Sequence, residues 1–452
     1  MIFAKRALLA TGWAQNVRIG VAQGCISEIA HDQTAQLGDQ HLDTVLPAMA
    51  NLHSHSFQRA MAGMTEHRHA GKDSFWTWRD LMYRFTAHLG PEDIEAIAAL
   101  VFLEMQEAGY ASVGEFHYLH HQPDGAPYDD QGELSHRICQ AASVTGIGLT
   151  HLPVLYTYGG AGQQALAPGQ ERFGNTPEQF TQLVERAGAC LDVLPDDFRI
   201  GIAPHSLRAT SPDDLAHVLP QFKDGPIHIH IAEQPKEVRD IQDWLGARPV
   251  DWLLQNTEVN TRWCLIHATH MTEAETHAMA QSGVVAGLCP VTEANLGDGP
   301  FNGPTYLTAG GRFGIGSDSN VLISLTEELR TLEYSQRLRD LARNVMVVGE
   351  GSVGRTLYTG AARGGAQALG RDAGEIAVGR LADLVAIDSS DPSLCALRDD
   401  QILDGLVFAA RDRVVTDLWS AGRHMVRDGR HVARDSITKA YRKTMARLVE
   451  AL

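Results

Sequence analysis

The segment VLPAMANLHSH, residues 45–55, is an apolar run that ends in two histidines separated by one residue. Seven more short apolar runs follow it, and stretches with apolar residues at helical spacing lie between them, as in residues 91–109. Eight strands that alternate with helices predict an α/β fold, the (β/α)8 TIM barrel. The predicted strands are residues 45–52, 112–116, 147–155, 200–204, 226–232, 264–268, 284–288 and 313–316.

The two ends of the chain have a different character. Residues 1–47 hold short segments typical of strands, and residues 376–452 hold more, separated by turn residues such as Asp428 and Gly429. Neither set is large enough to form a core alone. We therefore predict that the two ends pair into a small β-sandwich domain, while residues 48–375 form the barrel. Residues 436–452 are predicted to form an outer helix without a chemical role.

The composition of the 452 residues is that of an ordinary globular protein, with 44% hydrophobic and 21% charged residues. There are 55 acidic and 38 basic side chains, so the formal net charge is −17. This excess of negative charge argues against nucleic acid and anionic membranes as partners. No apolar run is long enough to span a membrane, and the apolar stretch near the N-terminus is too short for a secretory signal, which predicts a cytoplasmic protein.

The six cysteines are scattered along the chain and never form a C-x-x-C motif. Cys264 and Cys289 lie inside apolar runs, where a buried free thiol behaves as a small hydrophobic group. We therefore expect free thiols rather than disulfides or a thiol nucleophile.

Several predicted strand ends carry groups that can bind a metal ion. His53 and His55 end the first strand, where residues i and i+2 face the same way. His230 lies near the end of the fifth strand, and Asp318 follows the eighth. Three imidazoles and one carboxylate suit a single divalent ion, zinc above all, with one position left for water. Such an ion makes hydroxide available near neutral pH, which predicts a hydrolase.

Each of these signals is weak alone, because the chain has 21 histidines and aspartates are common in turns. Taken together, their order along the predicted barrel strands supports a metal site. His228 is expected to be structural. Glu233 lies just past the fifth strand, where it could reach a metal-bound water, although an acid at the start of a helix can also serve the helix dipole alone.

This pattern resembles the amidohydrolase superfamily, in which a metal-bearing barrel is joined to a β-sandwich built from both chain ends. The resemblance covers essentially the whole chain. The motif H-x-A-E at residues 230–233 and the segment GRLADLVAID look like the single-zinc deaminases of that superfamily. The fourth strand end, IAPHS, has no lysine that could bridge two metals, which disfavours the two-metal relatives.

A finer resemblance, to the formimidoylglutamate deiminases, rests on six segments: NLHSHSFQRAMAG (51–63), DSFWTWRDLMYR (73–84), EFHYLHH (115–121), HSLRA (205–209), HIHIAEQ (228–234) and TEANLGDG (292–299). It implies zinc-dependent hydrolysis of N-formimidoyl-L-glutamate to N-formyl-L-glutamate and ammonia in histidine degradation. It also implies a substrate pocket made of Gln58, Arg79, Tyr118, His205 and Arg208. Two arginines are what a small dicarboxylate substrate requires in an acidic protein, because arginine binds carboxylates bidentately.

Three residues take part in the expected reaction, and one of them, Asp318, is also a metal ligand. Asp318 accepts a proton from the attacking water with the help of His267, which also orients the attacking oxygen, and Glu233 carries a proton to the departing nitrogen. Arg59, Arg84 and Glu237 are interpreted as structural. For Arg79, pairing with Asp73 or Asp80 on the surface is an alternative, and Tyr118 could serve packing alone.

Two other functions stay open at this point. An aminohydrolase for a neutral heterocycle would use the same metal ligands but would not need paired arginines. A catalytically silent scaffold would be expected to have lost some of the ligands, whereas all are present here. The metal could also be iron or manganese, since the ligand set accepts all three, and a homodimer is a further possibility for a barrel of this size.

Overall fold

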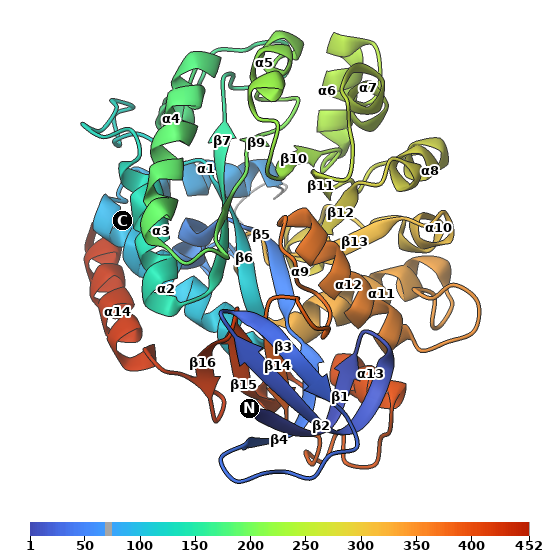
Figure 1. The fold of residues 1–452 in the computed structure, drawn as a ribbon. Coiled ribbons are helices and arrows are strands. Elements are labelled where there is room, and N and C mark those ends of the chain that lie inside the picture. Colours follow the sequence, from blue (N-terminus) through green and yellow to red (C-terminus); the bar gives the residue numbers. More distant parts are fainter. Residues whose placement is uncertain (68–74, 452) are drawn as a thin grey trace.

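The computed structural model describes residues 1–67 and 75–451. Its centre is a ring of parallel strands surrounded by helices (Figure 1). Hydrogen bonding joins these strands into one set of five and one set of four. The strands are β5 (Met49–Ser54), β6 (Tyr110–His117), β7 (Gly148–Leu155), β8 (Arg199–Ile200), β9 (Ala203–Pro204), β10 (Ile227–Ile231), β11 (Trp263–His267), β12 (Val285–Leu288) and β13 (Arg312–Ile315).

Single parallel bridges close the ring. Ile202 pairs with Ile227, and Ser54 pairs with Asp318. The fourth strand of the barrel is represented by the two short pieces β8 and β9, which both pair with β7. The predicted TIM barrel is therefore confirmed, with its eight strands in the predicted order.

Helices connect the strands, and several begin where the sequence provides a cap. In α4 and α5, a threonine or serine side chain accepts a hydrogen bond from a backbone N–H of the first turn, and a proline follows it. The helices are α1 (Phe75–Thr86), α2 (Pro91–Ala108), α3 (Glu133–Thr145), α4 (Pro177–Ala189), α5 (Pro212–Val218), α6 (Pro235–Leu245), α7 (Pro249–Asn256), α8 (Glu273–Gln281), α9 (Pro290–Leu296), α10 (Gly303–Thr308), α11 (Leu325–Asp340), α12 (Val353–Ala368), α13 (Asp400–Phe408) and α14 (Arg434–Ala451).

Both chain ends pair into one sheet beside the barrel, drawn at the bottom of Figure 1. Its order is β17-β16-β15-β14-β4-β1-β2-β3, so strands from the two ends meet where β14 pairs with β4. The strands are β1 (Ile2–Leu9), β2 (Gly12–Ala22), β3 (Cys25–Ala30), β4 (Gln40–Pro47), β14 (Leu384–Ile387), β15 (Val415–Ser420), β16 (Arg423–Arg427) and β17 (Arg430–His431).

One predicted strand, residues 45–52, is wrong in its extent. The chain leaves the terminal sheet at Pro47 and enters the barrel at Met49, so the apolar run serves two sheets. The backbone N–H of Ala48 donates to Asp383 in the terminal region, whereas that of Met49 donates to Gly109 before β6. The run is buried on both sides of this change, and therefore its hydropathy does not reveal the break.

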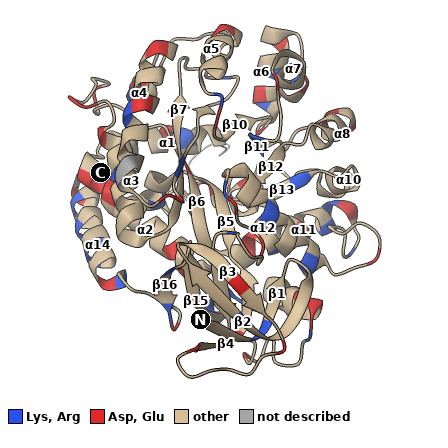
Figure 2. Cartoon of the chain, viewed as in Figure 1, with Lys and Arg blue, Asp and Glu red and all other residues tan. Residues whose placement is uncertain are grey.

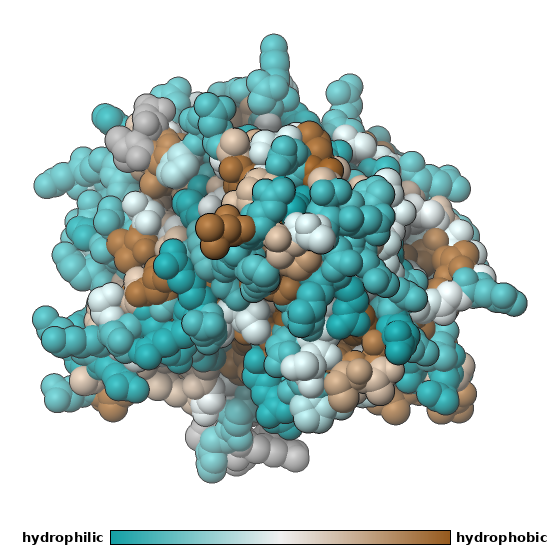
Figure 3. Space-filling view, turned by 60° about the horizontal axis from the view of Figure 1, so that its bottom comes forward, coloured by the Kyte–Doolittle hydropathy of each residue, from teal (hydrophilic) through white to brown (hydrophobic). Residues whose placement is uncertain are grey.

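The last helix, α14, lies along α2 on the outside of the barrel (Figure 1). Arg434 and Arg447 of α14 pair with Glu107 and Asp93 of α2. Most charged residues belong to the outer helices and loops rather than to the ring of strands (Figure 2). The face drawn in Figure 3 is mostly hydrophilic, with small separate hydrophobic groups.

The expectation about cysteines needs one correction. The structure pairs Cys139 of α3 with Cys190, just after α4, as a disulfide with their Cα atoms 6.6 Å apart. The pairing depends on two neighbouring helices of the barrel, which the scattered positions in the sequence do not reveal. Cys264 and Cys289 are buried free thiols, as expected. Within residues 1–67 and 75–451, no helix combines the length and the apolar character needed to cross a membrane.

Candidate active site

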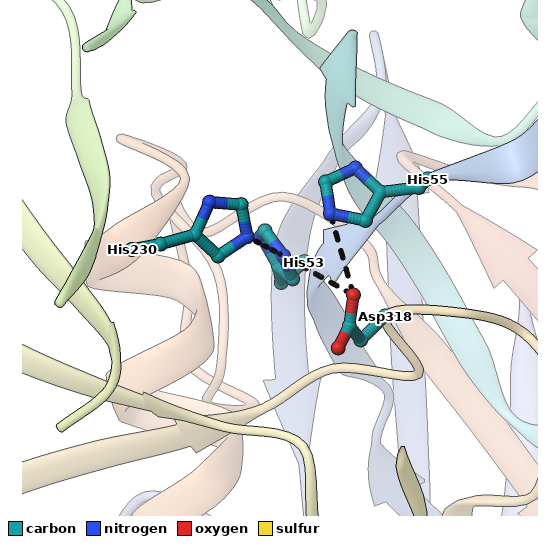
Figure 4. Close-up of side chains that lie close together, drawn as sticks. All are labelled: His53, His55, His230 and Asp318. Carbon is teal, nitrogen blue, oxygen red and sulfur yellow. Dashed lines mark hydrogen bonds and ion pairs between the residues drawn. The ribbon is translucent and has the colours of Figure 1, made fainter. Parts of the chain in front are cut away.

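Four side chains meet at the carboxyl end of the barrel (Figure 4). His53 comes from the end of β5 and His55 follows it, His230 lies in β10, and Asp318 follows β13. All four are buried, and their possible ligand atoms lie within 4.8 Å of one another. Asp318 Oδ1 is 3.5 Å from His53 Nε2 and 3.3 Å from His55 Nε2, and His230 Nε2 is 3.0 Å from His53 Nε2.

The hydrogen bonds behind these rings fit a metal ion. The Nδ1 atoms of His55 and His230 lie 2.9 Å and 3.1 Å from the carbonyl oxygens of Phe116 and His205. A carbonyl only accepts, so each Nδ1 carries the proton and each Nε2 presents a lone pair to the centre. Burial also lowers the pKa of His53, to about 3, which keeps that ring neutral. Neutral imidazoles directed at one carboxylate form the donor set of a divalent ion.

Hydrogen bonds join the ends of the first and eighth barrel strands beside the four proposed metal ligands. The backbone N–H of Asp318 donates to His53 at 3.0 Å, and that of His55 donates to Asp318 at 2.9 Å. Asn51 donates to the Ser317 hydroxyl at 2.6 Å and accepts from its backbone N–H at 3.1 Å. Asp318 holds a positive φ of 45°, which is costly for a residue other than glycine. These bonds hold the aspartate against the two histidines.

His267 faces the second carboxylate oxygen of Asp318, and Glu233 lies beside His267. The Nε2 atom of His267 is 3.7 Å from both Glu233 Oε1 and Asp318 Oδ2. Burial opposes the charged form of His267, but the neighbouring carboxylates prevail and raise its pKa to about 10. Burial raises the pKa of Glu233. The two side chains therefore form an acid–base pair next to the metal ligands.

Arg208 joins this group through an ion pair that the sequence did not reveal. Its Nη2 donates to Glu233 Oε2 at 3.3 Å, and its Nε lies 3.6 Å from Glu237 Oε2. Glu237 was interpreted as structural, and it accepts the backbone N–H groups of Ala232 and Glu233, each at 3.1 Å. Glu237 thus fixes both Arg208 and the backbone that carries Glu233.

Glu293 is a buried residue near the site, and no role is predicted for it from the sequence. It lies in α9, within the segment TEANLGDG, and its Oε1 is 3.2 Å from His267 Nδ1. The same oxygen accepts the backbone N–H of Cys289 at 2.9 Å. A carboxylate on Nδ1 leaves Nε2 of His267 to face Glu233 and Asp318. The only signal in the sequence was an acid soon after the seventh strand.

A cavity opens above the four ligands, and the predicted substrate residues line it. They are Gln58, Arg79, Tyr118, His205 and Arg208. Aromatic side chains complete the wall, among them Phe75, Trp78, Tyr83, Tyr156 and Phe173. Gln58 donates to the Tyr118 hydroxyl at 2.7 Å. The guanidinium of Arg79 lies 4.7 Å from the ring centre of Trp76, and its Nε is buried without a hydrogen-bond partner among the described residues. The possible partner Asp73 lies outside those residues.

The sequence of the chain matches known protein families. Residues 44–425 match the model described as "Amidohydrolase family". The chain therefore belongs to the amidohydrolase family, whose members are metal-dependent hydrolases. Residues 1–43 match the model "Formimidoylglutamate deiminase HutF, N-terminal domain". Within the family, the chain falls with the formimidoylglutamate deiminases: the protein of that name from Pseudomonas aeruginosa is 52% identical over 452 residues, which are 99% of both chains.

A further relative and two solved structures agree with the amidohydrolase family and its fold. A 5-methylthioadenosine/S-adenosylhomocysteine deaminase from Natronomonas pharaonis is 28% identical over 86% of this chain and 84% of its own. The crystal structure of an amidohydrolase from Brucella melitensis has a TM-score of 0.95 and 49% identity over 99% of each chain. An adenosine deaminase from Xanthomonas campestris with bound zinc shares the fold, with a TM-score of 0.81 and 23% identity over 99% and 98% of the chains. The predicted enzyme class, a hydrolase that cleaves C–N bonds as a deiminase, is confirmed.

Proposed function

We propose that the protein binds one zinc ion at His53, His55, His230 and Asp318 and hydrolyses N-formimidoyl-L-glutamate to N-formyl-L-glutamate and ammonia. The observation that carries this proposal is the presence of two arginines, Arg79 and Arg208, in the cavity that is also lined by three of the four ligands, His55, His230 and Asp318. The Pseudomonas aeruginosa relative named formimidoylglutamate deiminase supports the substrate, and the zinc in the Xanthomonas campestris deaminase supports the metal.

When bound, the ion would lower the pKa of a water molecule and so supply a nucleophile near neutral pH. Asp318 Oδ2 can accept a proton from the attacking water, while His267, which is already protonated and whose Nε2 lies 3.7 Å from that oxygen, orients the attacking oxygen. Oxygen adds to the formimidoyl carbon, and the bond from that carbon to the terminal nitrogen then breaks. Both protons of the added water end on this nitrogen, delivered by Glu233 after Asp318 has taken up the first, so the nitrogen leaves as ammonia and the oxygen remains as the formyl carbonyl.

Glu233 is well placed for this proton transfer. It is buried beside the cavity, and this burial raises its pKa, which favours the protonated form that the transfer requires. Arg208 and His267 lie at the two oxygens of its carboxylate, 3.3 Å and 3.7 Å away. These contacts fix the direction of the carboxyl group before the substrate enters.

We assign the substrate carboxylates to the basic side of the cavity. Arg79 has a buried Nε that still lacks a partner among the described residues, which suits an incoming carboxylate. Arg208 is already held by two glutamates, so its remaining donors can bind a substrate carboxylate without moving. Gln58, Tyr118 and His205 offer neutral hydrogen bonds around the formimidoyl group or a carboxylate.

Ammonia release from a substrate panel tests the proposal. We compare N-formimidoyl-L-glutamate, formimidoylglycine, which lacks the second carboxylate, and 5-methylthioadenosine, a neutral substrate of the kind named for the second relative. The first compound is expected to give the highest kcat/KM by a wide margin. Equal turnover of formimidoylglycine, or preference for the nucleoside, would contradict the assignment of a dicarboxylate. Metal analysis of the protein as purified tests the zinc and its one-to-one ratio.

The predictions about binding partners, oligomeric state and cellular location remain predictions. A small dicarboxylate is the predicted ligand, and neither nucleic acid nor a membrane is predicted to bind. A homodimer and a location in the cytoplasm remain predictions, which sedimentation and cell fractionation would test.

A further inference from the structure

A second pocket adjoins the proposed substrate cavity and shares part of its wall, because Arg79, Tyr156 and Arg208 line both spaces. Among its described lining residues there is no metal ligand, and one of them is Lys236, whose side chain is 54% exposed. We call this space the outer pocket. Its volume is about 150 Å³, well above the roughly 15 Å³ that one water molecule needs. The proposed reaction gives this space no role.

Positive charge exceeds negative charge along the outer pocket. Its described lining residues include three cations, Arg79, Arg208 and Lys236, and one carboxylate, Asp240. Asp240 pairs with Lys236 one turn further along α6. The chain as a whole carries a formal net charge of −17, so its average field repels anions. The outer pocket is a local exception, to which an anionic group is attracted.

The ring of Trp76 brings two of these cations together. The guanidinium carbon of Arg79 lies 4.7 Å, and Lys236 Nζ 5.5 Å, from the centre of that ring. The face of an indole attracts cations without neutralising them, so both groups keep their charge beside the pocket. Arg79 also has a buried Nε without a hydrogen-bond partner among the described residues. A carboxylate held by Lys236 is therefore next to an arginine that still has a donor to offer.

The start of α6 is fixed with respect to Arg208. Glu237, the residue after Lys236, lies 3.6 Å from Arg208 Nε and accepts the backbone N–H groups of Ala232 and Glu233. The backbone of Lys236 is therefore anchored beside the substrate arginines, whereas its long side chain is half-exposed. A flexible cation on a fixed base suits the capture of a ligand that is then bound bidentately by arginine.

We propose that the outer pocket is an entry subsite, in which Lys236 takes a carboxylate of the substrate and passes it to Arg79 and Arg208. The identity of that substrate rests on the proposed function. Lys236 lines the outer pocket but not the cavity of the metal ligands, so it acts on the approach of the substrate and not on the chemical step. Its contribution should be largest at low ionic strength, because salt screens the attraction between exposed charges.

Steady-state kinetics of two variants test the entry subsite. Lys236→Met and Asp240→Asn break the same ion pair but change the charge of the pocket in opposite directions. At low salt, Lys236→Met should lower kcat/KM for N-formimidoyl-L-glutamate by about three- to tenfold at constant kcat, and Asp240→Asn should raise it. At about 1 M salt, where the screening length is about 3 Å, both variants should match the unaltered protein.

Lys223→Met is the matched control for net charge. Lys223 is exposed and precedes β10, at the opposite end of that strand from Glu233, so its loss should leave kcat/KM as it was. An equal fall in Lys223→Met would show an effect of net charge alone. A fall in both variants of the ion pair would show that the pair serves only the structure of α6. Either result, or an unchanged kcat/KM in Lys236→Met, would overturn the entry subsite.

Quenching of the fluorescence of Trp76 tests the outer pocket without any substrate. Trp76 is partly exposed, and its share of the signal is the difference that Trp76→Phe makes in each protein. Iodide should quench this share at least about twofold less in Lys236→Met than in the unaltered protein, whereas neutral acrylamide should quench both equally. Equal quenching by iodide, or a matching fall with acrylamide, would overturn the proposal. If no ammonia came from N-formimidoyl-L-glutamate, the proposed function would fail, and the iodide comparison would still decide whether the pocket attracts anions.

Discussion

Arg208 and Glu233 form a buried ion pair, with the arginine Nη2 donating to the glutamate Oε2 at 3.3 Å. A residue predicted to bind substrate thus also positions the residue predicted to carry the proton. The pair couples two tasks that sequence reasoning had assigned to separate side chains. A change at either residue should therefore affect both binding and turnover.

Replacement of Arg208 tests this coupling. Arg208→Lys keeps the charge but cannot reach Glu233 and Glu237 with the same planar group. We expect kcat to fall by about tenfold and KM for the dicarboxylate to rise as well. Steady-state kinetics measure both. Arg248→Lys is a matched control, because Arg248 pairs with the buried Glu275 away from the cavity, at 2.7 Å. A change in KM alone at position 208 would show that Glu233 does not depend on this arginine.

Glu233→Gln tests the proton transfer itself. The amide keeps the size of the side chain but cannot give or take a proton in this way, so kcat should fall by about 10²- to 10⁴-fold. Metal analysis should find the zinc content unchanged, since the four proposed ligands are intact. Turnover close to that of the unaltered enzyme would show that Glu233 does not transfer the proton to the departing nitrogen.

Glu293→Gln tests how His267 is oriented. The amide can present its nitrogen to His267 Nδ1 and so disturb the tautomer that the carboxylate imposes. We expect kcat to fall by about 10- to 100-fold while KM and metal content hold. Glu293→Asp, which keeps the charge at a shorter reach, should recover part of the loss. If Glu293→Gln only lowered Tm and left kcat intact, the residue would be structural.

Removal of the metal should affect both activity and stability. Three buried imidazoles and a carboxylate lose their common partner when a chelator takes the ion. Ammonia release should stop and return on addition of zinc. At a free zinc concentration of about 100 times Kd, binding should add about 2.7 kcal/mol to the free energy of unfolding. Thermal unfolding with and without zinc measures this, and an unchanged Tm would argue against these four ligands.

Two neighbouring buried histidines should make the fold sensitive to acid. His117 of β6 and His151 of β7 have ring centres 5.5 Å apart, and neither ring nitrogen of His151 has a hydrogen-bond partner among the described residues. Burial lowers the pKa of His151 to about 3. The unfolded chain takes up a proton near pH 6.5, so below that pH it binds more protons than the folded chain and the free energy of unfolding falls.

The expected loss for His151 between pH 7.5 and 5 is about 2 kcal/mol, from its two pKa values alone. Urea unfolding at several pH values measures it. His151→Gln should flatten this dependence, whereas the same change at the exposed His88 should leave it as it was. Equal slopes for the two variants would show that His151 is not the source.

The order of the barrel strands, and the strand ends at which polar groups gather, could be predicted from the sequence because barrel strands are short, apolar and regularly spaced. It failed where contacts depend on the folded chain. The break at Ala48 is hidden because both sheets bury the same run of residues. Glu293 acts through a hydrogen bond to another side chain, and Cys139 meets Cys190 only after two helices have packed together. None of these contacts produces a periodic pattern in the sequence.

The bridge between Ser54 and Asp318 has a consequence for how the enzyme comes into being. The two histidine ligands of the first barrel strand are synthesised early, but the aspartate that completes the metal site follows the last barrel strand. A growing chain therefore stays inert toward its substrate until that strand has been synthesised and docked. Closure of the barrel is therefore a precondition for the chemistry.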